Sequence, residues 1–152
     1  GGAAFTDNYV AKLHGIARGD KSIVFTGWQK GRTLSELYAH AKLFVHPSEN
    51  EGLPITVLQA MSYARPVLVS DIPEHKEVVA DCNFWFSNAK INSLAEKIAE
   101  LISNEPLLQE AGGKNKIIVE KNYNWEDVTK QTNVLYSASE NAVVKKLKTM
   151  EV

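Results

Sequence analysis

The residues best suited to chemistry lie at positions 51–59, where polar loop residues precede an apolar helical pattern. Glu51 and Gln59 stand eight positions apart, which in a helix spans about 12 Å at ~1.5 Å per residue. Side chains with this spacing can bind the two ends of one elongated ligand. The free N–H groups and positive dipole of the helix N-terminus between them suit a diphosphate. The pattern therefore predicts that Glu51 and Gln59 bind hydroxyl groups on either side of a diphosphate.

Short apolar runs with helical patterns between them supply the frame for this site. Each run is continuous rather than alternating, which indicates strands buried on both faces. The alternation of strands and helices implies parallel pairing, so the fold class is α/β, a parallel sheet with helices on both faces. The predicted strands are residues 23–25, 43–45, 67–69 and 84–86, and the predicted helices are residues 6–17, 34–41, 54–63, 74–80 and 91–103.

Helix start signals support this order of elements. Thr33 followed by Glu36 is a capping-box pattern, and Pro54 suits the first turn of its helix. Candidate starts of later helices are Pro106 and Trp125, and a candidate break is the pair Gly112 and Gly113.

Polar and glycine residues follow the predicted strands at the points where the strands end. Gly27 and Trp28 follow the first run, residues 46–51 the second, and Ser70 with Asp71 the third. In open α/β sheets the ligand crevice lies outside the carboxyl ends of the strands. We therefore expect the binding site at this edge of the sheet.

The composition limits the classes of protein to which the chain can belong. With 152 residues, 44% of them hydrophobic and 23% charged, it is the right size for one globular domain. A net charge of -1 argues against a nucleic-acid partner, which needs clustered Lys and Arg. The single cysteine, Cys82, cannot form an internal disulfide, and no apolar run approaches the ~20 residues needed to cross a bilayer. We expect a cytoplasmic protein that binds a small molecule.

The chain begins at Gly1 rather than Met, which suggests a fragment. Gly1 and Gly2 fit either a cloning scar or the tight turn that ends a preceding strand. Both explanations stay open.

The residues around the predicted site resemble the retaining GT-B glycosyltransferases of family 4, also called glycosyl transferases group 1. That family carries a strand ending in Pro-Ser, then Glu-Gly-Phe-Gly or Glu-Gly-Leu-Pro, then a helix with a second Glu and an Ala-Met pair. The matching residues here are Pro47, Ser48, Glu51, Gly52, Leu53, Pro54, Gln59, Ala60 and Met61.

Flanking segments extend the resemblance over about residues 5–137. Residues 23–27 resemble the family's V-x-F-x-G strand and turn, after which the backbone meets the nucleotide base. Residues 65–67 resemble its G-x-P-V strand, residues 70–79 its loop ending in Glu-Val, and residues 123–125 its Phe-Ser-Trp.

The resemblance implies a Rossmann-like C-terminal half of a GT-B fold that lacks its first βα unit. Residues 1–137 would form the nucleotide-sugar-binding domain, and residues 138–152 a C-terminal helical tail. Glu51 would be the catalytic residue beside the donor sugar hydroxyls, and Gln59 would face the ribose. The other expected donor-binding residues are Gly27, Trp28, Gly52, Leu53, Pro54, Ile55 and Thr56.

The chain departs from the family in two ways. Gln59 replaces the usual Glu, which keeps one acceptor oxygen and removes the charge, so ribose binding is expected to change in strength. The family's phosphate-binding Arg and Lys lie upstream of the residues present here, as does the acceptor-binding N-terminal domain. Charge on the leaving diphosphate would then lose its main stabilisation, so the isolated chain is expected to be inactive.

The resemblance also implies the ligands and location of the parent enzyme. It would be a hexosyltransferase of polysaccharide or glycoconjugate biosynthesis that uses a nucleotide sugar and needs no cofactor and no metal. His46 fits this, because no acid or second ligand at metal spacing accompanies it in the sequence. Any membrane association, peripheral at the inner face, would arise through the parent.

Two alternatives share this architecture. Sugar-nucleotide 2-epimerases bind similar donors but lack the Glu-Gly-Leu-Pro pattern. A non-catalytic nucleotide-sugar-binding module is suggested by Gln59.

Overall fold

The computed structural model describes residues 6–88 and 90–150, with side chains described as far as residue 138. The chain divides into two compact units, Gly1–Leu37 and Tyr38–Val152. The sheet belongs to the second unit.

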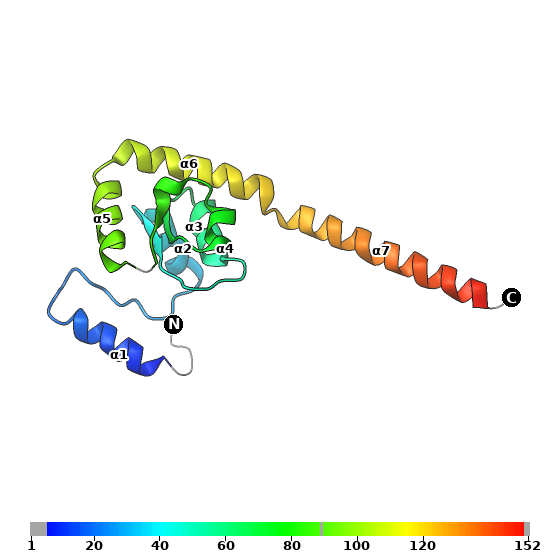
Figure 1. Ribbon diagram of the computed structural model, residues 1–152, viewed down its shortest axis with the longest axis horizontal. Coiled ribbons are helices and arrows are strands. Elements are labelled where there is room, and N and C mark those ends of the chain that lie inside the picture. The colour runs from blue at the N-terminus through cyan, green and yellow to red at the C-terminus, as the bar shows by residue number, and fades with distance from the viewer. Residues whose placement is uncertain (1–5, 89, 151–152) are drawn as a thin grey trace. The chain divides into compact units, whose positions relative to one another are not determined.

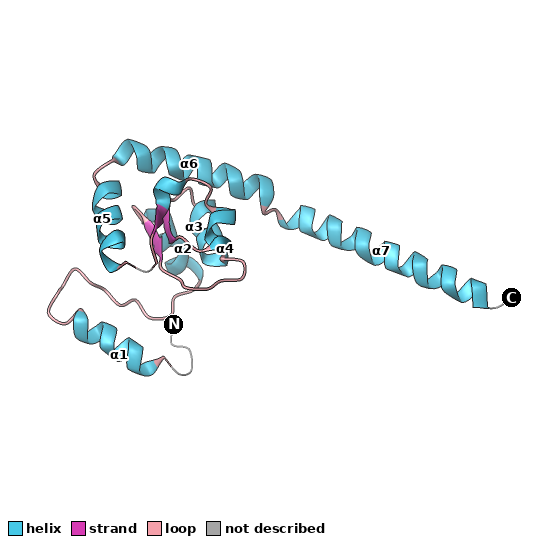
Figure 2. Ribbon diagram, viewed as in Figure 1, coloured by secondary structure: helices cyan, strands magenta, loops and turns pink. Residues whose placement is uncertain are grey.

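Within the described residues, three parallel strands form the sheet, in the order β1-β2-β3. Figure 2 draws the strands in magenta, and Figure 1 labels the helices around them. They are β1, Phe44–His46; β2, Val67–Ser70; and β3, Trp85–Phe86. In the register, Phe44 pairs with Val67 and Val69 pairs with Trp85. All four residues of β2 are buried, as expected for a central strand covered on both faces. The predicted strands at 43–45, 67–69 and 84–86 are thus confirmed, each within one residue.

The helices agree with the predicted pattern in number and order. They are α1, Asp7–Ile16; α2, Gly31–His40; α3, Ile55–Ser62; α4, Pro73–Val78; α5, Ile91–Ile102; α6, Glu105–Asn122; and α7, Trp125–Met150, with a 3-10 turn at Cys82–Phe84. The predicted capping box at Thr33 and Glu36 is wrong, because α2 already begins at Gly31 and Thr33 lies inside it.

Apolar side chains pack the helices onto the sheet. The buried residues of α3 are Val57, Leu58, Ala60 and Met61. This helix contacts β1 and β2, while α5 contacts β3, and Figure 2 shows the strands between the two helices. The helix α6 packs against both α3 and α5 (Figure 1). The core therefore fixes where α3, the helix of the predicted site, begins.

The glycine pair does not interrupt α6, so that predicted break is wrong. A Cβ atom added at Gly112 would collide with the carbonyl oxygen of Ala64, whereas one at Gly113 would meet nothing within 4 Å. Close by, Asn115 Nδ2 donates to Arg65 O at 3.0 Å. Gly112 is therefore a contact residue, which lets α6 approach the backbone that follows α3.

The strand predicted at residues 23–25 is wrong. Ile23, Val24 and Phe25 lie outside regular structure and are 49%, 75% and 46% exposed. Ile23 N donates to the nearby Asp20 O at 3.3 Å, and the ring of Phe25 stacks on that of His14 at 3.8 Å. An apolar run becomes a strand only beside a neighbour that pairs with it, and among the described residues no strand does so.

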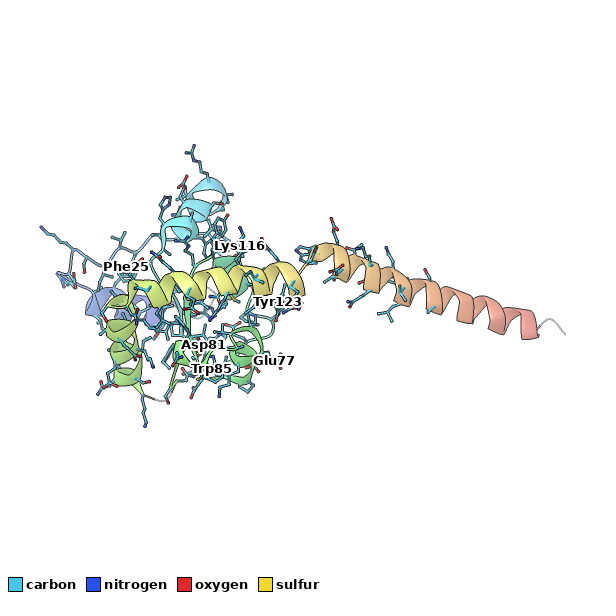
Figure 3. The ribbon with its side chains drawn as sticks, turned by 90° about the horizontal axis from the view of Figure 1, so that it is seen from above. Phe25, Glu77, Asp81, Trp85, Lys116 and Tyr123 are labelled. Atoms are coloured by element: carbon cyan, nitrogen blue, oxygen red, sulfur yellow. The ribbon has the colours of Figure 1, made fainter. Side chains whose placement is uncertain are left out.

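Trp85, the first residue of β3, binds the backbone directly after α4. Its indole Nε1 donates to Val79 O at 2.7 Å, and Lys76 Nζ lies 5.3 Å from its ring centroid. Trp85 is labelled in Figure 3. This side chain is half-buried.

The last helix continues through the boundary expected between residues 137 and 138, since α7 runs from Trp125 to Met150. The division into a domain and a tail stays a prediction, and residues 151–152 lie outside the described part. Across the described residues, no helix combines the length and apolar character that a membrane span requires.

Candidate functional site

The segment between β1 and α3 presents an open surface of loop and first helical turn. Gly52 and Thr56 are exposed, and Leu53 and Ile55 are 56% and 60% exposed. Pro54, directly before α3, is fully buried. Its side chain therefore shapes the start of the helix and is closed to a ligand.

Gln59 lies on α3 and is oriented by Tyr38, a contact that the sequence did not indicate. The Tyr38 hydroxyl donates to Gln59 Oε1 at 3.2 Å. Burial raises the pKa of Tyr38, and Tyr63 adds to the effect, so this hydroxyl keeps its proton. This contact occupies one lone pair of the amide oxygen and fixes the orientation of the amide, which leaves the NH2 group of the exposed Gln59 as a donor for a ligand.

His46, at the end of β1, and His75, on α4, meet behind Glu51. His46 Nδ1 lies 3.1 Å from His75 Nε2, and His46 Nε2 lies 3.6 Å from Glu51 Oε1. His75 Nδ1 lies 3.0 Å from both Ser70 O and Ser70 Oγ. We call Ser70, His75 and His46 the histidine relay.

The proton positions in the relay follow from its fixed partners. Ser70 O can only accept, so His75 Nδ1 carries a proton and donates to it. The Ser70 hydroxyl donates to Ser48 O, and Ser48 N–H donates to Ser70 Oγ at 3.2 Å. His75 Nε2 is then a lone-pair acceptor that faces His46 Nδ1.

The environment of His46 shifts its pKa. Burial lowers its pKa from the usual 6.5; the carboxylate of Glu51 opposes this effect, and the imidazole of His75 adds to it. His46 is therefore neutral at physiological pH, with one ring proton to place.

Ligand atoms of His46, Glu51 and His75 lie within 4.8 Å of one another, a grouping compatible with a metal ion. The expectation that His46 has no acid and no second ligand at metal spacing is therefore wrong, because Glu51 and His75 both lie beside it in the folded chain. The sequence hid this cluster because its members come from different elements: His46 ends β1, and His75 lies on α4, the helix that follows the neighbouring strand β2. The adjacency of those two strands was the signal that could have revealed it.

Two expected site residues belong to the first unit. Gly27 has a left-handed backbone with φ 63°, and Trp28 is 79% exposed. Their approach to a nucleotide base stays a prediction, as do the ligand roles of the residues from Glu51 to Gln59.

Comparison with known proteins gives a consistent family assignment. Residues 8–125 match the family model described as Glycosyl transferases group 1. The chain is 29% identical to the O-antigen chain mannosyltransferase B of Escherichia coli over 119 residues, covering 77% of this chain and 31% of that protein. It is 34% identical to sulfoquinovosyl transferase SQD2 of Arabidopsis thaliana over 124 residues, covering 76% of this chain and 24% of that protein. The chain thus spans about a third or less of the length of these relatives.

Solved structures share the fold. Sucrose-phosphate synthase from Thermosynechococcus elongatus superposes with a TM-score of 0.80 at 21% identity, over 89% of this chain and 34% of that one. TarM superposes with a TM-score of 0.72 at 25% identity, over 86% of this chain and 26% of that one. The expected fold class, a Rossmann-like parallel sheet with helices, is confirmed.

Proposed function

This chain belongs to the glycosyl transferases group 1 family, and from that premise we propose that it is the nucleotide-sugar donor-binding half of a retaining GT-B enzyme of family 4. The parent would transfer a sugar, of the hexosyl type, from a nucleoside diphosphate to an acceptor. Glycosyltransferases among its relatives support the reaction class, whereas the donor and the stereochemistry belong to the proposal.

The observation that carries the proposal is the segment Gly52–Thr56, which is exposed except at Pro54 and which leads into α3 between Glu51 and Gln59. A diphosphate at the start of α3 would meet the positive end of the helix dipole. Glu51 would accept a hydrogen bond from a hydroxyl group of the donor sugar. Its carboxylate would also stabilise the positive charge that develops on the sugar ring in the transition state. Gln59 would meet the ribose.

The test is a backbone amide chemical-shift titration of this chain with UDP, GDP, ADP, UDP-glucose and GDP-mannose. Saturable shifts at Gly52, Thr56 and Gln59 are expected, and their ranking identifies the base. Glu51→Gln should weaken the nucleotide sugars more than the free diphosphates, since it alters only the sugar contact. Glu49→Gln, the same change at an exposed position of the same loop, should alter neither. Absence of shifts at millimolar ligand would refute donor binding by this chain.

A second candidate is a non-catalytic nucleotide-sugar-binding module, which the Gln59 departure favours. It predicts the same shifts and a parent protein that binds donor without transferring sugar. A sugar-nucleotide epimerase is the remaining alternative, and analysis of products from the full-length parent distinguishes it from a transferase.

A further inference from the structure

The histidine relay runs from the interior of the second unit to the surface of the proposed site. Ser70 and His75 are fully buried. At the outer end, the side chains of His46 and Glu51 are 22% and 26% exposed. Of the residues in this cluster, the function proposed above assigns a role to Glu51 alone, so the three residues behind it are unexplained.

The relay selects one tautomer of His46. A proton on Nδ1 makes a hydrogen bond of 3.1 Å to the lone pair of His75 Nε2. A proton on Nε2 would instead point at Glu51 across 3.6 Å, which is too long for a hydrogen bond, and would leave two lone pairs facing each other at 3.1 Å. Buried polar atoms without a partner are costly. The Nδ1–H tautomer is therefore the stable one.

With that tautomer, His46 Nε2 and the Glu51 carboxylate are two acceptors that lie side by side with no proton between them. Such a pair needs hydrogen-bond donors from a ligand or from water. Hydroxyl groups on adjacent carbons of a sugar ring supply two donors in a fixed arrangement. His46 ends β1 and Glu51 lies in the loop that follows, directly before the exposed Gly52 and Leu53.

We infer that His46 and Glu51 together form a subsite for adjacent hydroxyl groups of the donor sugar, and that His75 is a positioning residue that fixes the tautomer of His46. The inference rests on the proposed function, because it concerns the sugar of the same donor. His46, which is not one of the family motif residues, would thus help to determine which sugar the site binds.

A metal ion explains the cluster less well. His75 and Glu51 approach opposite ring nitrogens of His46, Nδ1 and Nε2. An ion bound to all three would need one ligand atom from each, and such atoms lie within 4.8 Å of one another. It would take the lone pair of His75 Nε2, which now faces His46 Nδ1 at 3.1 Å, and would so break that hydrogen bond.

The first test is a spectrum of the imidazole ring nitrogens of this chain at neutral pH, which distinguishes protonated from unprotonated nitrogen. His46 and His75 should both be protonated at Nδ1 and unprotonated at Nε2. His75→Phe keeps an aromatic ring in the buried position but removes its nitrogens, and should return His46 to a mixture of tautomers. His14→Phe is the matched control on α1 and should leave His46 unchanged. A proton on Nε2 of His46 in the unchanged chain would overturn the inference without any variant.

The second test compares UDP with UDP-glucose and GDP with GDP-mannose. The His46 Nε2 signal should move with a nucleotide sugar and not with the matching diphosphate, while the amides of Gly52 and Thr56 move with both. His46→Phe should weaken the nucleotide sugar relative to the diphosphate by about fivefold, the value of one hydrogen bond.

Failure of the inference and failure of the proposed function give different results. If the amides move and His46 does not respond to the sugar, the subsite is refuted and donor binding stands. If nothing moves with any nucleotide, donor binding itself is refuted. Saturable binding of Zn²⁺ that is lost in His46→Phe and in His75→Phe would replace the hydroxyl subsite with a metal site.

Discussion

At the scale of single residues, the site depends on which groups are already engaged before a ligand arrives. Tyr38 holds the oxygen of Gln59, and His75 holds Nδ1 of His46. The first contact fixes the orientation of the Gln59 amide, and the second fixes which ring nitrogen of His46 carries the proton. The ligand therefore meets an amide donor from Gln59 and a lone pair from His46.

Gln59→Glu should change this balance. A carboxylate would keep the hydrogen bond from Tyr38 and offer its second oxygen to the ribose hydroxyls as a charged acceptor, and charge-assisted hydrogen bonds are the stronger kind. We expect binding of UDP or GDP to tighten by about tenfold, measured by calorimetry. Gln109→Glu on the exposed face of α6 is the control. Weaker binding would show that the amide donor of Gln59 suits the native ligand.

His46 should make stability depend on pH. Its pKa is lowered from 6.5 in the folded chain. Just below pH 6.5, His46 therefore binds more protons in the unfolded chain than in the folded chain. Its contribution to the free energy of unfolding then rises with pH through this range and is lost as the pH falls. Urea unfolding at pH 7.5 and pH 5 measures the difference. The decrease should be smaller in His46→Gln and unchanged in His14→Gln. An equal decrease in all three proteins would contradict the assignment to His46.

At the scale of elements, continuous apolar runs predicted β1, β2 and β3 because burial on both faces leaves a mark on the sequence. The same kind of run at residues 23–25 predicted a strand that is absent, because a strand also needs a neighbour and composition does not report one. The site likewise combines features that a local pattern reveals with contacts that it does not. Glu51 and the start of α3 were predictable from local pattern, whereas Tyr38 and His75 reach Gln59 and His46 across 21 and 29 positions of sequence.

The packing of α6 gives a sharp prediction for Gly112. Gly112→Ala would drive a methyl group into the backbone of Ala64, and overpacking of this kind costs about 1–3 kcal/mol of unfolding free energy. Gly113→Ala, the neighbouring change in the same helix, meets open space and should stabilise by about 0.5–1 kcal/mol. Denaturant unfolding of the two variants measures both effects. Equal effects would mean that α6 can move away from Ala64.

At the scale of the whole molecule, the chain spans about a third or less of its relatives, and a transferase needs more than a donor site. We expect no sugar release from UDP-glucose or GDP-mannose by the purified chain above the rate in buffer, because the proposed site offers the leaving diphosphate only one helix N-terminus. Mass spectrometry of a long incubation measures it. Turnover that Glu51→Gln abolishes would show that the chain is catalytically sufficient.

The three tryptophans differ in burial, so the fluorescence of the one in the sheet can be measured separately from that of the other two. Trp85 is half-buried with its indole N–H bound to Val79 O, whereas Trp28 and Trp125 are 79% and 81% exposed. In a protein carrying Trp28→Phe and Trp125→Phe, tryptophan fluorescence would come from Trp85 of β3 alone. Its emission should shift to longer wavelength when the second unit unfolds, and acrylamide should quench it less than it quenches the unchanged chain. The sheet thus contains its own fluorophore, which reports on the second unit whatever the first unit does.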